Sequence, residues 1–179
     1  MCPHSLPFAL TALTTLSIVP APGHGQEAAG TPAIPQSIQA EHQEIHEGLV
    51  AATKLQGPVG EAARNLAKVL HPHFVREEEI ALPPLGMLAP LASGQMPAGT
   101  DAVLQMTDQL RRELPRMLEE HTQIRAAVHK LGEAAAAQGN AEVSRLAEAL
   151  ALHARTEEEV LYPAAVLVGD LIRARQAHK

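Results

Sequence analysis

The stretch HFVREEE at residues 73–79 returns as HARTEEE at residues 153–159. In both copies a histidine stands four residues before the first glutamate of a triplet. The preceding segments match as well, with EHQEI at residues 41–45 before the first copy and EHTQI at residues 120–124 before the second. This repetition predicts that the chain contains two copies of one helical hairpin.

The composition favours helices and excludes several classes of site. The chain has 179 residues, enough for one domain with a real core. Aromatic residues make up only 2%, so leucine, alanine, valine and isoleucine must form that core. A net charge of −6 without a long basic run argues against nucleic acid as a partner. Cys2 is the only cysteine, so a disulfide or thiolate metal site is excluded from the folded body.

The N-terminal region differs from the rest of the chain. Residues 1–25 contain an uncharged apolar stretch followed by small residues, and we interpret them as an export signal that directs the protein to the periplasm or exterior. If they are not a signal, a cytoplasmic location follows. Residues 26–36 form a linker, and residues 37–179 form the folded domain with its C-terminal tail. No membrane span is expected in the mature protein.

Hydrophobic periodicity and helix-stop residues divide the folded domain into four long helices. The expected ranges are 37–55, 59–82, 101–131 and 140–161, with a short C-terminal helix at 164–175. Ser37 and Asn140 are the expected caps, and Gly132 is expected to close the third helix. The long connection at 83–100 is a candidate lid. The sequence therefore predicts an all-α fold, an up-down-up-down antiparallel four-helix bundle with a short C-terminal helix.

The apolar face of each long helix carries one histidine, and two of the faces also carry a glutamate one turn further on. These six residues are at similar distances from the interhelical turns, so the bundle should bring them to one level of its core. The candidate metal ligands are His42, His73, Glu77, His121, His153 and Glu157.

Two buried carboxylates need compensating positive charge, because burying an ionised group alone costs several kcal/mol. No lysine or arginine occurs on the four apolar faces at that level. A pair of divalent cations would supply the charge, and imidazole with carboxylate suits iron, with manganese or zinc less favoured. We expect the first two helices to serve one ion and the last two the other, although the sequence leaves this pairing open.

Several nearby residues allow two interpretations. His46 is either a fifth histidine ligand or an exposed side chain. Tyr162 either packs in the core or donates to a bound ligand. Glu78 and Glu158 are either charges on the outer face or hydrogen-bond partners of the ligand histidines.

The ligand order resembles the hemerythrin-like, or HHE, cation-binding family, as does the run EEVLYP at residues 158–163. The resemblance covers about residues 37–165. It implies a non-heme di-iron centre bridged by Glu77 and Glu157 and by an oxo or hydroxo group. Arg125 stands where oxygen-carrying hemerythrins have another histidine, so the chain is more similar to the branch with four histidines and two glutamates.

Three classes of function are compatible with this pattern. The first is a di-iron protein that binds or senses O₂ or NO, or handles reactive oxygen such as peroxide, together with an unidentified redox partner. The second is iron storage, iron delivery or repair of iron–sulfur clusters. The third is a structural bundle without metal. Whether the protein turns over a substrate as an enzyme is left open by the sequence.

Overall fold

The structure is a computed structural model that describes residues 32–178. The predicted export signal and most of the predicted linker lie outside the described residues. The longer helices are α1 (Gln36–Thr53), α2 (Gly57–Ile80), α4 (Thr100–Ala137), α5 (Ala141–Thr156) and α6 (Tyr162–Ala177). Three short elements complete the described chain, namely the 3₁₀ helix η1 (Pro83–Met87), α3 (Leu88–Ala92) and the π-helix η2 (Glu157–Leu161).

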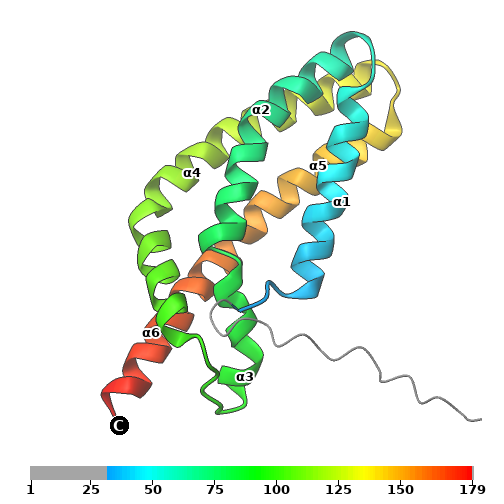
Figure 1. Cartoon of the computed structure of the whole chain (residues 1–179). Helices are drawn as coiled ribbons and strands as arrows, with labels where there is room; N and C mark the ends of the chain where they lie inside the picture. Colours follow the sequence, from blue (N-terminus) through cyan, green and yellow to red (C-terminus); the bar gives the residue numbers. More distant parts are fainter. Residues whose placement is uncertain (1–31, 179) are drawn as a thin grey trace, which may run out of the picture.

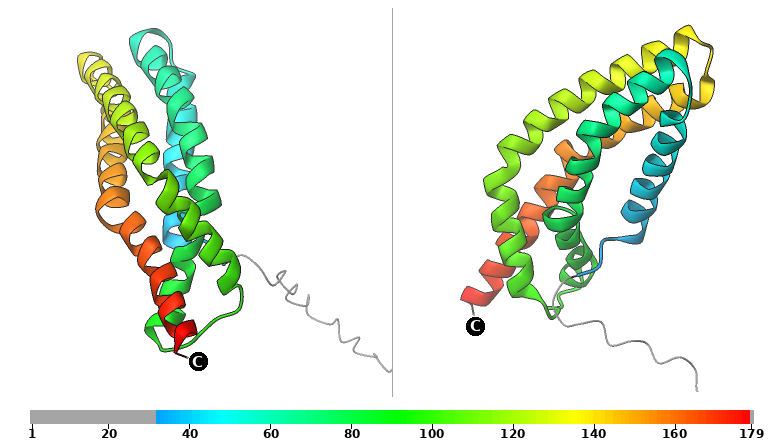
Figure 2. Two further views of the ribbon diagram at one scale, coloured as in Figure 1. Left: turned by 90° about the vertical axis from the view of Figure 1, so that its left-hand side faces the viewer. Right: turned by 45° about the horizontal axis from the view of Figure 1, so that its top comes forward.

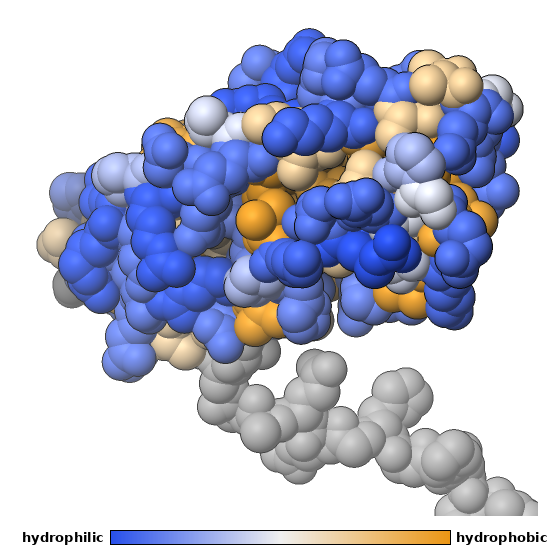
Figure 3. Space-filling model, turned by 90° about the horizontal axis from the view of Figure 1, so that it is seen from above, coloured by the Kyte–Doolittle hydropathy of each residue, from blue (hydrophilic) through white to orange (hydrophobic). Residues whose placement is uncertain are grey.

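These elements form the expected all-helical bundle, which confirms the predicted fold class. The hairpin of α1 and α2 lies beside the hairpin of α4 and α5 (Figures 1 and 2). The end of the molecule that carries the two interhelical turns is largely hydrophilic, with apolar side chains visible in the seam between the hairpins (Figure 3). Within residues 32–178, no helix combines the length and the apolar character needed to cross a membrane.

The helix boundaries differ from the predicted ones where the sequence signals compete. α1 begins at Gln36 without a side-chain cap, so the predicted Ser37 cap is wrong. The predicted Asn140 cap is confirmed, because its side chain accepts a hydrogen bond from the backbone N–H of Val143 at 3.1 Å. α4 runs through Gly132 to Ala137, because the alanines that follow the glycine favour helix and Gly139, at φ 64°, takes the left-handed turn instead.

The connection between α2 and α4 covers one end of the bundle. Leu82, Leu85, Met87 and Leu91 are all buried there, and η1 contacts α6. The segment that we considered as a lid is therefore packed into the core through its apolar side chains.

The fourth long helix continues past its predicted end. α5, η2 and α6 follow one another as a continuous helical rod, drawn from orange to red in Figure 1. In η2 the backbone N–H of Tyr162 bonds to the carbonyl of Glu157, five residues back. Pro163 follows directly, and its ring would clash with the carbonyl four residues back in an unbroken α-helix, so the wider turn accommodates it.

The polar residues of the bundle lie between two apolar clusters. One cluster contains Ile45, Leu66, Phe74, Ile124 and Leu150 among others, and the second is built around Ile80, Leu82, Leu110, Met117 and Tyr162. Along α1, α4 and α5 the candidate ligands fall between residues of the two clusters, and on α2 Glu77 does so, while His73 lies directly before Phe74 of the first cluster. The core therefore has one polar layer with an apolar layer on each side.

Candidate metal centre

The structure brings all six predicted ligands into the polar layer. None of them exposes more than 4% of its surface. Their nitrogen and oxygen atoms form two overlapping groups, the first containing His73, Glu77, His121 and Glu157 and the second containing His42, His153 and Glu157.

The histidines pair across the two hairpins and not within them. The rings of His73 on α2 and His121 on α4 are 4.6 Å apart, and those of His42 on α1 and His153 on α5 are 4.9 Å apart. The expected pairing of the first two helices and of the last two is therefore wrong, because the hairpins dock with α2 against α4 and α1 against α5. We call the His73–His121 pair the inner position and the His42–His153 pair the outer position.

Each buried carboxylate faces both positions. Oε1 of Glu157 lies 3.5 Å from Nε2 of His42, and its Oε2 lies 3.4 Å from Nε2 of His121. Oε1 of Glu77 lies 3.3 Å from Nε2 of His73, and its Oε2 lies 4.0 Å from Nε2 of His42. Both carboxylates can thus share their oxygens between two cations.

The Nδ1 atom of every histidine points away from this centre towards a further glutamate. The distances are 2.9 Å for His73 to Glu120, 2.9 Å for His121 to Glu158, 3.2 Å for His153 to Glu41 and 3.4 Å for His42 to Glu78. Such carboxylates are typical partners of metal-binding histidines, because they orient the ring and leave the other nitrogen free for the metal.

From the sequence alone, two of these four glutamates were not assigned a role. Glu41 and Glu120 stand directly before a candidate histidine, but each lies against Nδ1 of a histidine of the other hairpin. The repeated Glu-His pair was the available signal for them. Glu158 does hydrogen-bond to a candidate histidine, as one of the two sequence interpretations stated.

The electrostatics of the layer reflect its two buried acids. Burial and the nearby charge of Glu157 raise the pKa of Glu77. Burial alone would also raise the pKa of Glu157, but contacts with His121, His153 and His42 hold it well below its usual range. The layer therefore holds at least one ionised carboxylate.

Two of the histidines hold a proton strongly in the absence of metal. Burial alone would lower the pKa of His73, yet its contact with Glu77 raises that pKa to about 9. The pKa of His153 likewise rises to about 9, because Glu157 outweighs the effect of burial.

Several buried atoms have no hydrogen-bond partner among the described residues. They are Nδ1 and Nε2 of His42, Nε2 of His153, Oε2 of Glu77 and Oε1 of Glu157. His153 Nε2 and Glu157 Oε1 are only 2.9 Å apart, but they lack the geometry of a hydrogen bond. Unpartnered buried groups are costly. A cation would satisfy the nitrogen and oxygen atoms that face the outer position, so the donor set fits a metal such as iron.

Tyr162 reaches the centre because the π turn directs it inward. It is 1% exposed, and its hydroxyl donates to Oε1 of Glu77. The hydroxyl oxygen also lies 3.3 Å from Nε2 of His73 and 3.2 Å from Nε2 of His121. Burial, followed by the charges of Glu77 and Glu157, raises the pKa of Tyr162 far above its usual range, so the phenol keeps its proton.

His46 does not join the cluster. Its side chain is exposed, and its ring lies 6.4 Å from that of His71, away from the polar layer. Of the two interpretations made for this residue, the structure supports the exposed side chain.

Comparison with known proteins identifies one family. The sequence pattern described as "Hemerythrin HHE cation binding domain" matches residues 33–165. No curated protein and no solved structure matches the chain.

Proposed function

This chain belongs to the hemerythrin HHE cation-binding domain family, and on that premise we propose that it holds two non-heme iron ions and binds or senses O₂ or NO, or handles peroxide. The observation that carries the proposal is the buried layer of four histidines and two glutamates, in which each carboxylate faces both histidine pairs.

The residues present would divide between the ions in a simple way. His73 and His121 would hold one ion, and His42 and His153 the other. Glu157 belongs to both groups of donors, and Glu77, whose Oε2 lies 4.0 Å from Nε2 of His42, would reach from the first group to the second. When bound, a pair of iron ions held by so few protein donors supplies open coordination positions and redox chemistry towards small ligands. Iron is favoured over zinc because it binds histidine and carboxylate donors and supplies redox chemistry that zinc lacks, although manganese shares these donors.

The remaining residues prepare the site for that chemistry. Glu120 and Glu158 hydrogen-bond to Nδ1 of His73 and His121, and Glu41 and Glu78 lie beside Nδ1 of His153 and His42. These carboxylates favour ring orientations in which the Nε2 atoms point inward. The two apolar clusters exclude bulk water from both sides of the layer. A dry, shaped cavity is what the protein contributes to reactive metal chemistry.

An anaerobic ligand-binding experiment tests the proposal. Protein loaded with iron and reduced should develop near-ultraviolet charge-transfer absorption on exposure to O₂, and its spectrum should change with NO or peroxide. A His121→Ala variant should lose the response. A His129→Ala variant should keep it, since His129 is exposed on the same helix two turns away. Iron-loaded protein that responds to none of these ligands would contradict the proposed function.

A further inference from the structure

We propose that the two positions take up metal in a fixed order, the outer position first, and that the hydroxyl of Tyr162 sets this order. The inference rests on the proposed function, because it takes the polar layer to be a site for two ions. It adds that the two halves of the site are unequal although the sequence repeat makes their histidines and glutamates equivalent.

The inner position already has a partner for its inward-facing atoms. The hydroxyl of Tyr162 donates to Oε1 of Glu77 and lies within 3.3 Å of Nε2 of both His73 and His121. A metal ion approaching these three atoms must compete with the hydroxyl. The hydrogen bond to a carboxylate is among the stronger kinds, so this competition should weaken binding at the inner position.

The inward-facing atoms of the outer position have no such partner. Nε2 of His42, Nε2 of His153 and Oε1 of Glu157 are buried and make no hydrogen bond within the described residues. Tyr162 has no counterpart at the outer position. The second repeat has Tyr162 five residues after Glu157, whereas the first has Leu82 five residues after Glu77. A metal ion gains these three donors without displacing a hydrogen-bonded hydroxyl.

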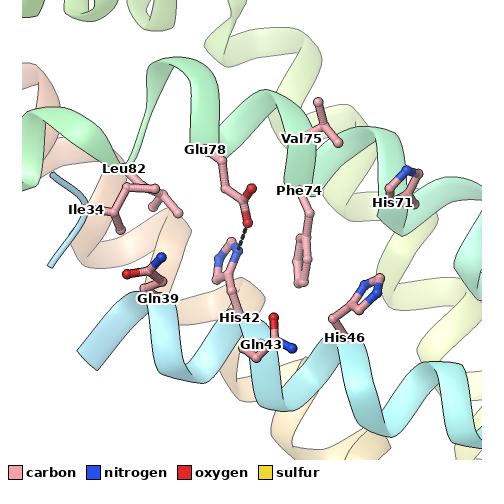
Figure 4. A pocket seen from close by; sticks show the side chains of 10 residues that line it. All are labelled: Ile34, Gln39, His42, Gln43, His46, His71, Phe74, Val75, Glu78 and Leu82. Carbon is pink, nitrogen blue, oxygen red and sulfur yellow. Dashed lines mark ion pairs between the residues drawn. The ribbon is translucent and has the colours of Figure 1, made fainter. Parts of the chain in front are cut away.

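The outer position is approached from solvent beside an exposed carboxylate. A pocket of about 330 Å³ reaches His42, with His46, His71 and Phe74 in its walls (Figure 4). In this view Glu78 stands over the imidazole of His42, which stacks on Phe74 at 4.3 Å. Glu78 is 52% exposed and makes no hydrogen bond with His42. The carboxylate between solvent and His42 is therefore only loosely held.

At the inner position, arginines hold the corresponding carboxylates in place. A second pocket, of about 280 Å³, touches His73. There, Glu120 hydrogen-bonds to Nδ1 of His73 at 2.9 Å and is itself bound by Arg116 at 2.8 Å. On the other histidine of the pair, Glu158 is held by Arg125. Among the described residues, no arginine binds Glu41 or Glu78, the carboxylates beside Nδ1 of His153 and His42.

The test is a titration of the metal-free full-length protein with zinc ions, followed by NMR of the histidine ring nitrogens. Zinc serves as a diamagnetic probe that accepts the same donors. The first equivalent should shift the signals of His42 and His153, and the second should shift those of His73 and His121. The second dissociation constant should exceed the first by roughly 10- to 100-fold or more, the factor that a hydrogen bond to a charged group represents.

The Tyr162→Phe variant removes only the hydroxyl. It should bind two zinc ions with the two dissociation constants brought closer by the same roughly 10- to 100-fold factor, and the first equivalent should shift all four histidines. A Thr107→Val variant is the matched control, because it removes another buried hydroxyl that lies outside the layer. This control should keep the wild-type order.

The outcomes separate the two proposals. If the inner histidines of the wild-type protein shift first or together with the outer pair, the loading order is wrong while a two-ion site stands. If Tyr162→Phe fills its two positions in the same order as the wild type, the hydroxyl does not set the loading order. If zinc shifts none of the four histidines, the metal site itself, and with it the proposed function, is wrong.

Discussion

At the scale of single residues, the carboxylates decide how the histidines behave. Each histidine has a carboxylate near Nδ1 and another near Nε2. For His73 and His153 these contacts raise the pKa to about 9 and favour the charged imidazolium, so a metal ion that binds there must displace a proton. Protons and metal ions therefore compete for the same nitrogen atoms.

The first prediction concerns pH. His73 and His153 have pKa values of about 9, so metal binding should release their protons throughout the neutral range. Metal affinity should fall as the pH decreases from 9, by up to roughly tenfold per pH unit for each of the two histidines. Calorimetric competition with a chelator between pH 6.5 and 9 measures this. An affinity that is constant across the range would show that these nitrogens do not bind the metal.

The same raised pKa values make the metal-free fold more stable at low pH, the opposite of their effect on metal affinity. A histidine whose folded pKa is raised contributes stability that is fully present below its unfolded pKa of about 6.5. That contribution is lost as the pH rises through about 9. The metal-free protein should therefore unfold at lower urea concentration at pH 9 than at pH 6.5, while metal-loaded protein should not follow this trend.

The second prediction concerns Glu77, whose ionised form is opposed by burial and by Glu157. The Glu77→Gln variant removes that repulsion and should lose metal binding. Its metal-free stability should differ from that of the wild type by no more than roughly 2 kcal/mol, because relief from burial and from the repulsion by Glu157 offsets the lost contact with protonated His73. Urea unfolding of both metal-free proteins measures the difference, with the exposed Glu148→Gln as control. A strongly destabilised Glu77→Gln variant would argue that the carboxylate is structural.

At the scale of helices, the π turn explains a failure of the sequence pattern. In a regular α-helix Val160, three residues after Glu157, would lie on the inner face, but it is 55% exposed. The extra residue of η2 makes the inward step from Glu157 five residues long, which brings Tyr162 into the layer. A single π turn cannot be recognised from apolar residues spaced three and four apart. Its only sign in the sequence is the proline that follows it.

The third prediction compares two glycines that lie inside helices. A Cβ at Gly132 would meet Ala147 at an ordinary 3.6 Å, whereas one at Gly169 would lie 2.3 Å from Oγ1 of Thr107. Gly132→Ala should therefore raise the unfolding free energy by about 0.5–1 kcal/mol through helix propensity. Gly169→Ala should lower it by roughly 1–3 kcal/mol, because α6 must move away from α4.

Denaturant unfolding of the two alanine variants checks this comparison. Removing the Thr107 hydroxyl and methyl groups, as Thr107→Ala in the Gly169→Ala background, should restore part of the lost stability. Equal effects of the two glycine substitutions would mean that α6 is not packed closely on α4.

At the scale of the whole molecule, the repeat made the fold and the six buried residues predictable. A histidine or glutamate spaced three or four residues from apolar residues lies on the same helical face as they do. It therefore points to the core, whichever way the helices pack. The pairing of the histidines was not predictable, because it depends on how one hairpin docks on the other. Glu41 and Glu120 were missed for the same reason, since each acts on a histidine of the opposite hairpin.

The whole bundle is also what makes the candidate site. One histidine comes from each of α1, α2, α4 and α5, so the donor set exists only when both hairpins are docked. Metal binding should therefore stabilise the assembled bundle against unfolding, as any ligand of the native state does.

The iron content of the full-length protein, measured by elemental analysis after purification from its host, tests the central claim most directly. We predict about two iron ions per chain in the wild type, the number that two histidine pairs with shared carboxylates can hold, and a loss of both in Glu157→Gln. Protein that contains no metal, or a Glu157→Gln variant that keeps the wild-type iron content, would contradict the account.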